Sequence, residues 1–247
     1  MDAITENTVL GGRVRLLQPE RGYRAGLDAA LLAAACDAGP AARVLEAGCG
    51  VGAALLAAAA RRAETCFTGL ERDPVTAGLA RRNIALNQLT ARVEVLEGDV
   101  AERFTTLERA PYDAAMTNPP FFDDPRMLRA PAAERRGAWM ADDGLGAWIG
   151  FLLKAVREGG TLTVIHRADR LGDILGLLEP KAGSVQIRPV HPFADAPAKR
   201  VLVRAVKTGK APLLLLPPLV LHSRQGPGKH TPEAEAILRG EAALGWG

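Results

Sequence analysis

The sequence predicts an α/β fold in which helices cover both faces of a mostly parallel β-sheet. Between residues 43 and 206, short apolar segments rich in Val, Leu and Thr alternate with Ala- and Leu-rich segments of helical length. Several of the short segments end at an acidic or polar residue that is followed by glycine or proline. Strands that alternate with helices at this spacing are typical of a doubly wound sheet.

The first 40 residues are expected to form a β-hairpin and one helix ahead of this sheet. Residues 8–17 place apolar side chains on both sides of Gly11-Gly12, and glycine supplies the positive φ angles that a tight hairpin turn needs. Residues 28–36 (DAALLAAAC) predict a compact apolar helix. Asp28 lies in its first turn, where the helix dipole favours an anion.

The sheet itself is predicted from seven apolar segments. Strands are expected at residues 43–47, 66–70, 92–96, 112–117, 161–166, 185–190 and 200–206, and helices at residues 53–62, 74–86, 139–157 and 171–178. Asp73 and Pro74 supply an N-cap and an N1 proline to the second of these helices, and Gly159-Gly160 is expected to end the third. The last two strands are expected to pair antiparallel.

The chain, residues 1–247, is expected to form one domain without an internal repeat. Residues 1–40 hold the N-terminal hairpin and helix, residues 41–210 the core, and residues 211–247 a C-terminal extension. Thr231 is placed to cap a short final helix in that extension.

The composition fits a globular cytoplasmic protein. The chain has 247 residues, of which 48% are hydrophobic, and its longest aliphatic run, residues 213–221, is interrupted by Pro217-Pro218 and is too short to span a membrane. The N-terminus does not resemble a secretory signal. Cys36, Cys49 and Cys66 are far apart, which argues against a metal site or a disulfide framework.

The net charge of +3 conceals an uneven distribution. Residues 181–230 hold nine Lys/Arg and a single acid, Asp195, for a net charge of +8, whereas residues 1–180 have a net charge of −3. Such asymmetry is typical of a protein that binds a polyanion. A solvated basic face without a partner fits the same counts equally well.

A glycine-rich loop, EAGCGVG at residues 46–52, follows the first core strand and precedes a helix. Glycines let the backbone turn sharply and let a ligand approach its N–H groups. The pattern Gly48-x-Gly50-x-x-Ala53 also fits a dinucleotide fingerprint. Glu46 favours another ligand, because a carboxylate there would repel a pyrophosphate but suits the ammonium and sulfonium end of S-adenosylmethionine.

Two further acids follow the next two strands. Glu71 ends the second core strand, where its two oxygens can accept both ribose hydroxyls. Asp99 follows the third, where its side chain or the Val100 N–H can contact the adenine edge. Open α/β sheets bind ligands at the carboxyl ends of their strands. Each acid by itself fits a solvated loop carboxylate, but the set of three with the glycine loop predicts a site for S-adenosylmethionine.

The segment Asn118-Pro119-Pro120-Phe121 is expected at the end of the fourth strand, beside this cofactor. Two prolines prevent the strand from continuing, so the Asn118 side-chain oxygen and the Pro119 carbonyl can stand together as two acceptors. Such a pair matches an –NH2 group on a planar centre and aims its nitrogen at the methyl group. Phe121 can stack the planar substrate. A proline-rich turn with an Asn cap is the structural alternative.

At these motifs the chain resembles the class I methyltransferases that methylate nitrogen. Within that group it is similar, over nearly its whole length, to the bacterial family that methylates adenine N6 next to the anticodon of valine tRNA. Further matching segments are LGGRV (10–14), GYRAGLDA (22–29), GTLTVIHR (160–167) and AKRVLV (198–203). The better-known form of the tetrad ends in Tyr; Phe121 retains stacking but lacks the phenol hydroxyl.

The resemblance implies a Rossmann-like class I methyltransferase fold with a seven-stranded sheet whose last strand is antiparallel. It implies S-adenosylmethionine as the cofactor, with the segment around residues 24–28 closing over its methionine end. The implied cofactor residues are Arg24, Gly26, Asp28, Glu46, Gly48, Gly50, Glu71, Arg72, Asp99, Val100 and Asn118. The implied catalytic residues are Asn118, Pro119, Pro120 and Phe121.

A tRNA substrate agrees with the basic C-terminal third, because tRNA binding needs phosphate contacts. The candidate contacts are Lys199, Arg200, Arg204, Lys207 and Lys210, with Arg126 and Arg129 as further candidates. The target base would be splayed out and stacked on Phe121 or Phe122. We expect Trp148 and His166 to be packed or satisfied polar side chains rather than substrate contacts.

Three other functions stay open at this point. A protein glutamine amide, as in release-factor methyltransferases, also offers –NH2, although the basic C-terminal third favours RNA. Guanine N2 of ribosomal RNA is methylated by enzymes with a similar Asn-Pro-Pro-Phe segment. The last of the three is a nucleotide- or RNA-binding protein without catalysis. The intact Glu46, Glu71 and Asn118 argue against it.

Overall fold

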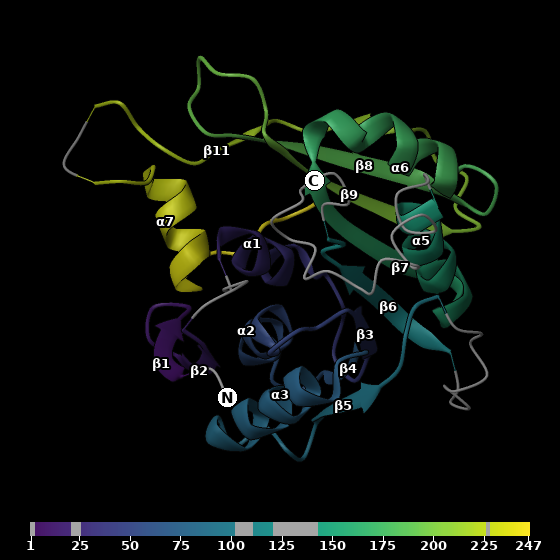
Figure 1. The fold of residues 1–247 in the computed structure, drawn as a ribbon. Coiled ribbons are helices and arrows are strands. Elements are labelled where there is room, and N and C mark those ends of the chain that lie inside the picture. The colour runs from purple at the N-terminus through teal and green to yellow at the C-terminus, as the bar shows by residue number, and fades with distance from the viewer. Residues whose placement is uncertain (1–2, 21–25, 102–110, 121–142, 226–227) are drawn as a thin grey trace, which may run out of the picture.

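The computed structural model describes residues 3–20, 26–101, 111–120, 143–225 and 228–247. Helices lie on both faces of a large sheet, and a two-stranded hairpin packs against two of the helices on one face (Figure 1). The strands are β1 (Ile4–Val9), β2 (Val14–Pro19), β3 (Arg43–Ala47), β4 (Cys66–Glu71), β5 (Val93–Glu97), β6 (Tyr112–Thr117), β7 (Val156–Arg167), β8 (Ala182–His191), β9 (Arg200–Lys207), β10 (Leu214–Leu215) and β11 (Leu219–Val220). The helices are α1 (Leu27–Ala35), α2 (Ala53–Arg61), α3 (Pro74–Leu86), α5 (Asp143–Ala155), α6 (Leu171–Leu178) and α7 (Pro232–Arg239).

Within the described residues, the large sheet has nine strands in the order β10-β8-β9-β7-β6-β3-β4-β5, with β11 also paired to β8. Neighbours from β5 to β7 are parallel, and β9 is antiparallel to both β7 and β8. The predicted mostly parallel sheet with an antiparallel last core strand is therefore confirmed. The sheet differs from the predicted seven strands by β10 and β11, which contain two residues each and are too short to show a period-2 pattern.

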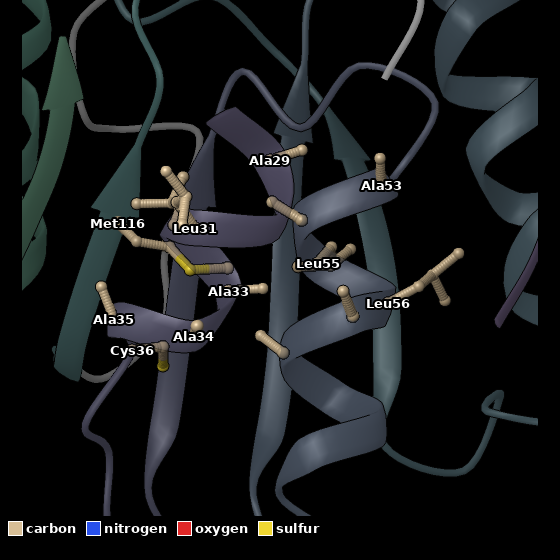
Figure 2. Close-up of a cluster of buried hydrophobic side chains, with 14 of the residues drawn as sticks. Ala29, Leu31, Ala33, Ala34, Ala35, Cys36, Ala53, Leu55, Leu56 and Met116 are labelled. Atoms are coloured by element: carbon tan, nitrogen blue, oxygen red, sulfur yellow. The ribbon is translucent and has the colours of Figure 1, made fainter. Parts of the chain in front are cut away.

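Two hydrophobic cores lie on opposite faces of this sheet. On one face, α1 and α2 lie side by side against the strands, as Figure 2 shows, and Leu31, Leu55 and Met116 are at most 1% exposed there. On the other face, α5 and α6 cover the sheet, and Leu152 and Ile174 are fully buried. Burial from both sides explains why the core strands are apolar runs rather than strictly alternating sequences.

The N-terminal hairpin turns through four residues, from Leu10 to Arg13, rather than through the two glycines alone. Gly11 and Gly12 take positive φ angles, as predicted, and Leu10 adds a third at +56°. The predicted helix caps are confirmed: the Asp73 side chain accepts from the Val75 N–H, and the Thr231 hydroxyl accepts from the Ala234 N–H.

The boundary between α5 and β7 differs from the prediction. The sequence predicts a helix up to Arg157 that ends at Gly159-Gly160, but α5 ends at Ala155 and β7 follows at once. The ladder between β6 and β7 shifts register here, and a Cβ atom on Gly160 would lie 2.7 Å from the Asp113 carbonyl oxygen. The glycines therefore permit close strand contact at an irregular ladder instead of ending the helix.

In the described ranges, no helix has both the length and the apolar character needed to cross a membrane.

Candidate active site

Four chain segments meet at the carboxyl edge of the sheet, because β3, β4, β5 and β6 are parallel neighbours. The Thr117 hydroxyl donates to the Ala47 carbonyl at 2.9 Å and joins the tips of β6 and β3. The Gly98 N–H donates to the Glu71 carbonyl at 3.0 Å and joins the segments after β5 and β4. The glycine loop, the two acids after β4 and β5, and Asn118 thus lie along one edge, which we call the carboxyl rim.

The Glu71 carboxylate is held in place by backbone hydrogen bonds. The Gly50 N–H donates to its Oε2 atom and the Asp73 N–H to its Oε1 atom, both at 3.0 Å. Gly48 and Gly50 adopt φ angles of +69° and +55°, a region that favours glycine. Each carboxylate oxygen accepts more than one hydrogen bond, so this oriented carboxylate can also accept the two hydroxyls of a ribose.

Glu46 is a buried carboxylate at the end of β3, with 3% of its surface exposed. Burial raises its pKa well above the ordinary value, the Leu55 N–H in the first turn of α2 opposes this rise, and the Glu71 charge adds to it. Its Oε2 atom has no hydrogen-bond partner among the residues that the structure describes. A buried acceptor without a partner is costly, so this atom fits a ligand that donates, such as the ammonium group of S-adenosylmethionine.

Asp99, Val100 and Arg72 lie on the β5 side of the rim. The Asp99 Oδ1 atom accepts from the Ala101 N–H at 2.9 Å, and its Oδ2 atom lies 3.7 Å from Arg72 Nη1. Val100 packs partly buried against the core under α5 and α6. These contacts fix the Asp99 carboxylate, and its role at an adenine edge stays a prediction.

Asn118, Pro119 and Pro120 directly follow β6. Asn118 is partly buried, Pro119 is buried and Pro120 is exposed. Within the described ranges, no backbone N–H donates to the Pro119 carbonyl, in keeping with prolines that leave the ladder. Phe121 and Phe122 lie outside the described residues. Stacking of a substrate and the pairing of the Asn118 and Pro119 oxygens therefore stay predictions.

Asn83 on α3 is a site residue that sequence reasoning missed. It is fully buried, and its amide nitrogen donates to the carbonyls of Val51 in the glycine loop and Leu17 in β2, both at 2.9 Å. Its amide oxygen accepts from the Leu17 N–H at 2.7 Å. Asn83 therefore ties the glycine loop to the hairpin. The sequence did offer one signal for this role: Asn has a low helix propensity, so an asparagine inside the helix predicted at residues 74–86 indicates a side chain with another function.

Trp148 on α5 packs against the glycine loop. A Cβ atom on Gly48 would lie 2.3 Å from the Trp148 Cη2 atom, so only glycine fits beneath the indole edge. The ring is partly buried and joins the core under α5 and α6. The structure agrees with the expected packing role and adds that this packing shapes the glycine loop.

Cys49 in the glycine loop is buried against β4. A Cβ atom on Gly69 would lie 2.6 Å from the Cys49 sulfur, and the Cys49 N–H donates to the Leu70 carbonyl at 3.0 Å. Burial, with the charges of Glu46 and Glu71, raises the pKa of this thiol well above its ordinary value. The thiol therefore stays protonated and packs as an apolar group.

His166 lies near the carboxyl end of β7, where the register Thr117↔Val164 brings it opposite the Asn-Pro-Pro segment. It is 3% exposed. Burial, followed by the charges of Arg170 and Arg167, lowers its pKa to about 4. His166 is therefore neutral at physiological pH.

The predicted closing segment before β3 makes an unexpected contact. Gly26 precedes α1 and is exposed, and Arg24 lies outside the described residues. The Asp28 carboxylate accepts from Arg200 Nε at 2.9 Å, and both side chains are mostly buried. Two residues predicted to contact different ligands, cofactor and RNA, thus contact each other.

Other basic side chains of β9 also have partners within the fold. Arg204 lies 2.7 Å from Asp37 and donates to Gln186 at 2.9 Å. Lys207 lies 3.2 Å from Glu158. Both acids belong to the first 180 residues, so with Arg200 three of the nine basic side chains counted in residues 181–230 pair with acids that are distant in sequence.

The two remaining RNA candidates, Lys199 and Lys210, are exposed at opposite edges of the sheet. Lys199 immediately precedes β9 and lies at the carboxyl rim, because β9 runs antiparallel to β7. Lys210 lies just beyond the other end of β9, at the edge where the parallel strands begin, which we call the amino edge. The five predicted RNA contacts therefore do not form one patch, and their role stays a prediction.

In the described part of the chain, no group of three or more His, Cys, Asp or Glu side chains could hold a metal ion. Arg126 and Arg129 lie outside the described residues.

Comparisons with known proteins agree with this geometry. The family described as methyltransferase small domain matches residues 24–133. The tRNA1(Val) (adenine(37)-N6)-methyltransferase of Bacteroides fragilis is 30% identical over 192 residues, which are 73% of this chain and 76% of that protein. The chain belongs to this methyltransferase family. Membership implies S-adenosylmethionine as the methyl donor.

Other relatives of this methyltransferase match over different lengths. The protein of the same name from Aeromonas salmonicida is 33% identical over 110 residues, 44% of this chain and 45% of that protein. The chain thus spans about half the length of that relative. The solved structure of a predicted O-methyltransferase from Agrobacterium tumefaciens has a TM-score of 0.73 at 30% identity and covers 88% of this chain and 98% of its own. The fold is that of a class I methyltransferase.

Proposed function

We propose that this protein methylates the exocyclic amino group of adenine, N6, in tRNA, at the adenine beside the anticodon of valine tRNA. The names of its relatives support this substrate. The observation that carries the proposal in this chain is the bond from Thr117 to Ala47, which brings Asn118 alongside the glycine loop. Binding of tRNA and a cytoplasmic location are part of the same proposal.

The carboxyl rim provides acceptors and donors for S-adenosylmethionine. Glu46 Oε2 would accept from its ammonium group, and Glu71 would accept its ribose hydroxyls. Asp99 and the Val100 N–H would contact the adenine edge, and the backbone of the glycine loop would pass close to the methionine part. When bound, S-adenosylmethionine supplies an electrophilic methyl group.

Asn118 and Pro119 would orient the target nitrogen. Their two oxygens accept the two hydrogens of the amino group, so that its lone pair is directed out of the base plane and away from delocalisation into the ring. The methylated nitrogen is acidic and loses one proton to water, so the site needs no strong base. Orientation and electrostatics therefore provide the rate enhancement.

The test is transfer of labelled methyl from S-adenosylmethionine to the tRNA, ribosomal RNA and protein of a cell extract, which are then separated, and the RNA is digested for nucleoside analysis. We expect label in N6-methyladenosine of tRNA, and labelling roughly 100- to 1000-fold slower with the Asn118→Ala variant. Label found only in protein would indicate that the substrate is a protein glutamine amide and not tRNA. Label in N2-methylguanosine of ribosomal RNA would indicate that the target base is guanine and not adenine.

A further inference from the structure

We propose that the carboxyl rim beside β8 and β11 carries a stacking site for the RNA nucleotides that flank the target base. This inference rests on the proposed function and names a surface for it. The site consists of the rings of Phe193, His222 and His230 with the side chains of Arg224 and Lys229.

These residues leave the sheet at the same edge as Asn118. β8 and β7 are both antiparallel to β9, so β8 runs in the same direction as β7 and β6, and β11 is parallel to β8. Phe193 follows the end of β8, and His222 follows the end of β11. The His222 N–H donates to the Pro192 carbonyl at 2.9 Å, which holds the two loops together. Figure 1 shows both loops extending beyond β11.

The three rings form a continuous row. The centroids of His222 and His230 are 5.0 Å apart with an interplanar angle of 27°, and those of Phe193 and His222 are 5.5 Å apart at 49°. All three rings are partly exposed, and none belongs to either hydrophobic core. Aromatic rings that stay accessible in a row give bases faces on which to stack.

Basic side chains accompany this row at the same rim. The Arg224 guanidinium lies 4.4 Å from the centre of the Phe193 ring, and Lys229 and Lys199 are exposed. An acid at this surface, Asp195, is 3.2 Å from Arg224, but both side chains are more than 60% exposed, so this ion pair is weak and can exchange for a phosphate. Aromatic faces combined with basic side chains are what single-stranded RNA sites use.

The position suits nucleotides next to the target base rather than the target itself. β8 is three strands away from β6 in the sheet order, a distance of roughly 14 Å at ~4.8 Å per strand. About four stacked nucleotides at ~3.4 Å each span such a distance. An RNA strand could thus present one base to Asn118 while its neighbours stack on the rings.

The amino edge of the same sheet offers matched controls. Lys181 and Lys210 are exposed there, like Lys229 and Lys199 at the carboxyl rim. A general effect of net charge would weaken RNA binding equally whichever edge is changed. A stacking site at the rim predicts a larger effect for changes at the rim.

The experiment measures the dissociation constant for a valine tRNA transcript by filter binding, with S-adenosylmethionine affinity and thermal midpoint measured in parallel. Phe193→Leu keeps the apolar volume and removes the aromatic face; we expect binding to weaken about tenfold. Lys229→Glu should weaken it severalfold, whereas Lys181→Glu should change it less than twofold. Cofactor affinity and the thermal midpoint should not change.

Ultraviolet cross-linking of the wild-type protein to the same transcript provides a measurement that does not depend on folding of a variant. We expect cross-links on the peptides that contain Phe193 or His222. Equal effects of Lys229→Glu and Lys181→Glu, or cross-links found only on other peptides, would overturn the stacking site while methylation of tRNA still stood. If the wild-type protein labels protein and neither binds nor labels tRNA, the proposed function fails as well.

Discussion

The two halves of the large sheet use their charged side chains differently. Where β3, β4 and β5 end, acids remain available to a ligand, as the buried Glu46 oxygen without a described partner shows. On β9, Arg200 and Arg204 are instead paired with Asp28 and Asp37 from the N-terminal part of the chain. The first half therefore keeps an acceptor without a partner among the described residues, whereas the basic side chains of β9 form ion pairs within the fold. A count of charges along the sequence cannot distinguish the two uses.

The sharpest test of the first half is Asn118→Ala. Loss of one of two acceptors for the target amino group should lower turnover roughly 100- to 1000-fold, by analogy with the loss of one oxyanion-hole donor. Cofactor affinity, measured by calorimetry, should change little, because Asn118 is proposed to orient the substrate. Equal losses in turnover and cofactor affinity would instead place Asn118 among the residues that hold the cofactor.

Glu46→Gln should weaken S-adenosylmethionine binding roughly 10- to 100-fold, because it removes a charge-assisted hydrogen bond to the ammonium group. The same change should stabilise the cofactor-free protein at pH 7. Burial raises the pKa of Glu46 in the folded state above its ordinary value of 4.5, so the cost of the wild-type carboxyl appears as pH rises above that value. The gain in thermal midpoint should vanish near pH 4.

The exposed Glu179→Gln is the control for this pair of measurements, and neither value should change. A Glu46→Gln variant that binds the cofactor as tightly as the wild-type protein would show that the buried oxygen does not contact it.

Asn83→Ala should lower the free energy of unfolding by about 2 to 3 kcal/mol, because buried groups of Leu17 and Val51 lose their partners. It should also raise the KM for S-adenosylmethionine through the freed glycine loop. Asn87→Ala is the matched control: Asn87 bonds Arg15 of the same hairpin at a more exposed position, and within the described ranges it has no hydrogen bond to the glycine loop. Equal KM values for both variants would show that the bond from Asn83 to the glycine loop does not affect cofactor binding.

The pair between Asp28 and Arg200 should show a coupling energy of about 1 kcal/mol in a double-mutant cycle of Asp28→Asn and Arg200→Gln. The measurement is chemical denaturation of the four proteins. Additive effects on the free energy of unfolding would mean that the ion pair itself does not stabilise the fold. The basic residues of β9 would then lose their proposed structural role.

The smallest effect is expected for exposed lysines. Lys199→Glu at the carboxyl rim should weaken tRNA binding a few-fold and reduce the slope of its salt dependence by about 1. Lys181→Glu at the amino edge should leave both unchanged. Equal slopes for both variants would show that RNA contacts the amino edge of the sheet as well as the carboxyl rim.

Local patterns explain what the sequence could predict. The carboxyl ends of the core strands, the Asp73 and Thr231 caps and the glycine loop depend on residues that are neighbours in the chain, and their positions agree with the structure. The parallel order of the strands then brings Glu71 and Asn118 to one rim without further information.

Contacts between distant segments explain what the sequence could not predict. Asn83 bonds residues 32 and 66 positions away, and Arg200 meets Asp28 172 positions away. Nothing in the sequence near Trp148 indicates that its ring edge lies on Gly48. Such pairs arise only once the helices are packed on the sheet, so they are invisible to periodicity and motif spacing.

The burial of two of the three cysteines has a practical consequence for labelling. Cys36 and Cys49 are buried with raised thiol pKa values, whereas Cys66 is exposed at the start of β4. A maleimide dye should therefore attach to one defined position of the native protein. That position is the length of a strand away from the carboxyl rim, roughly 17 Å, so a fluorophore or surface anchor there would report on ligands without obstructing them.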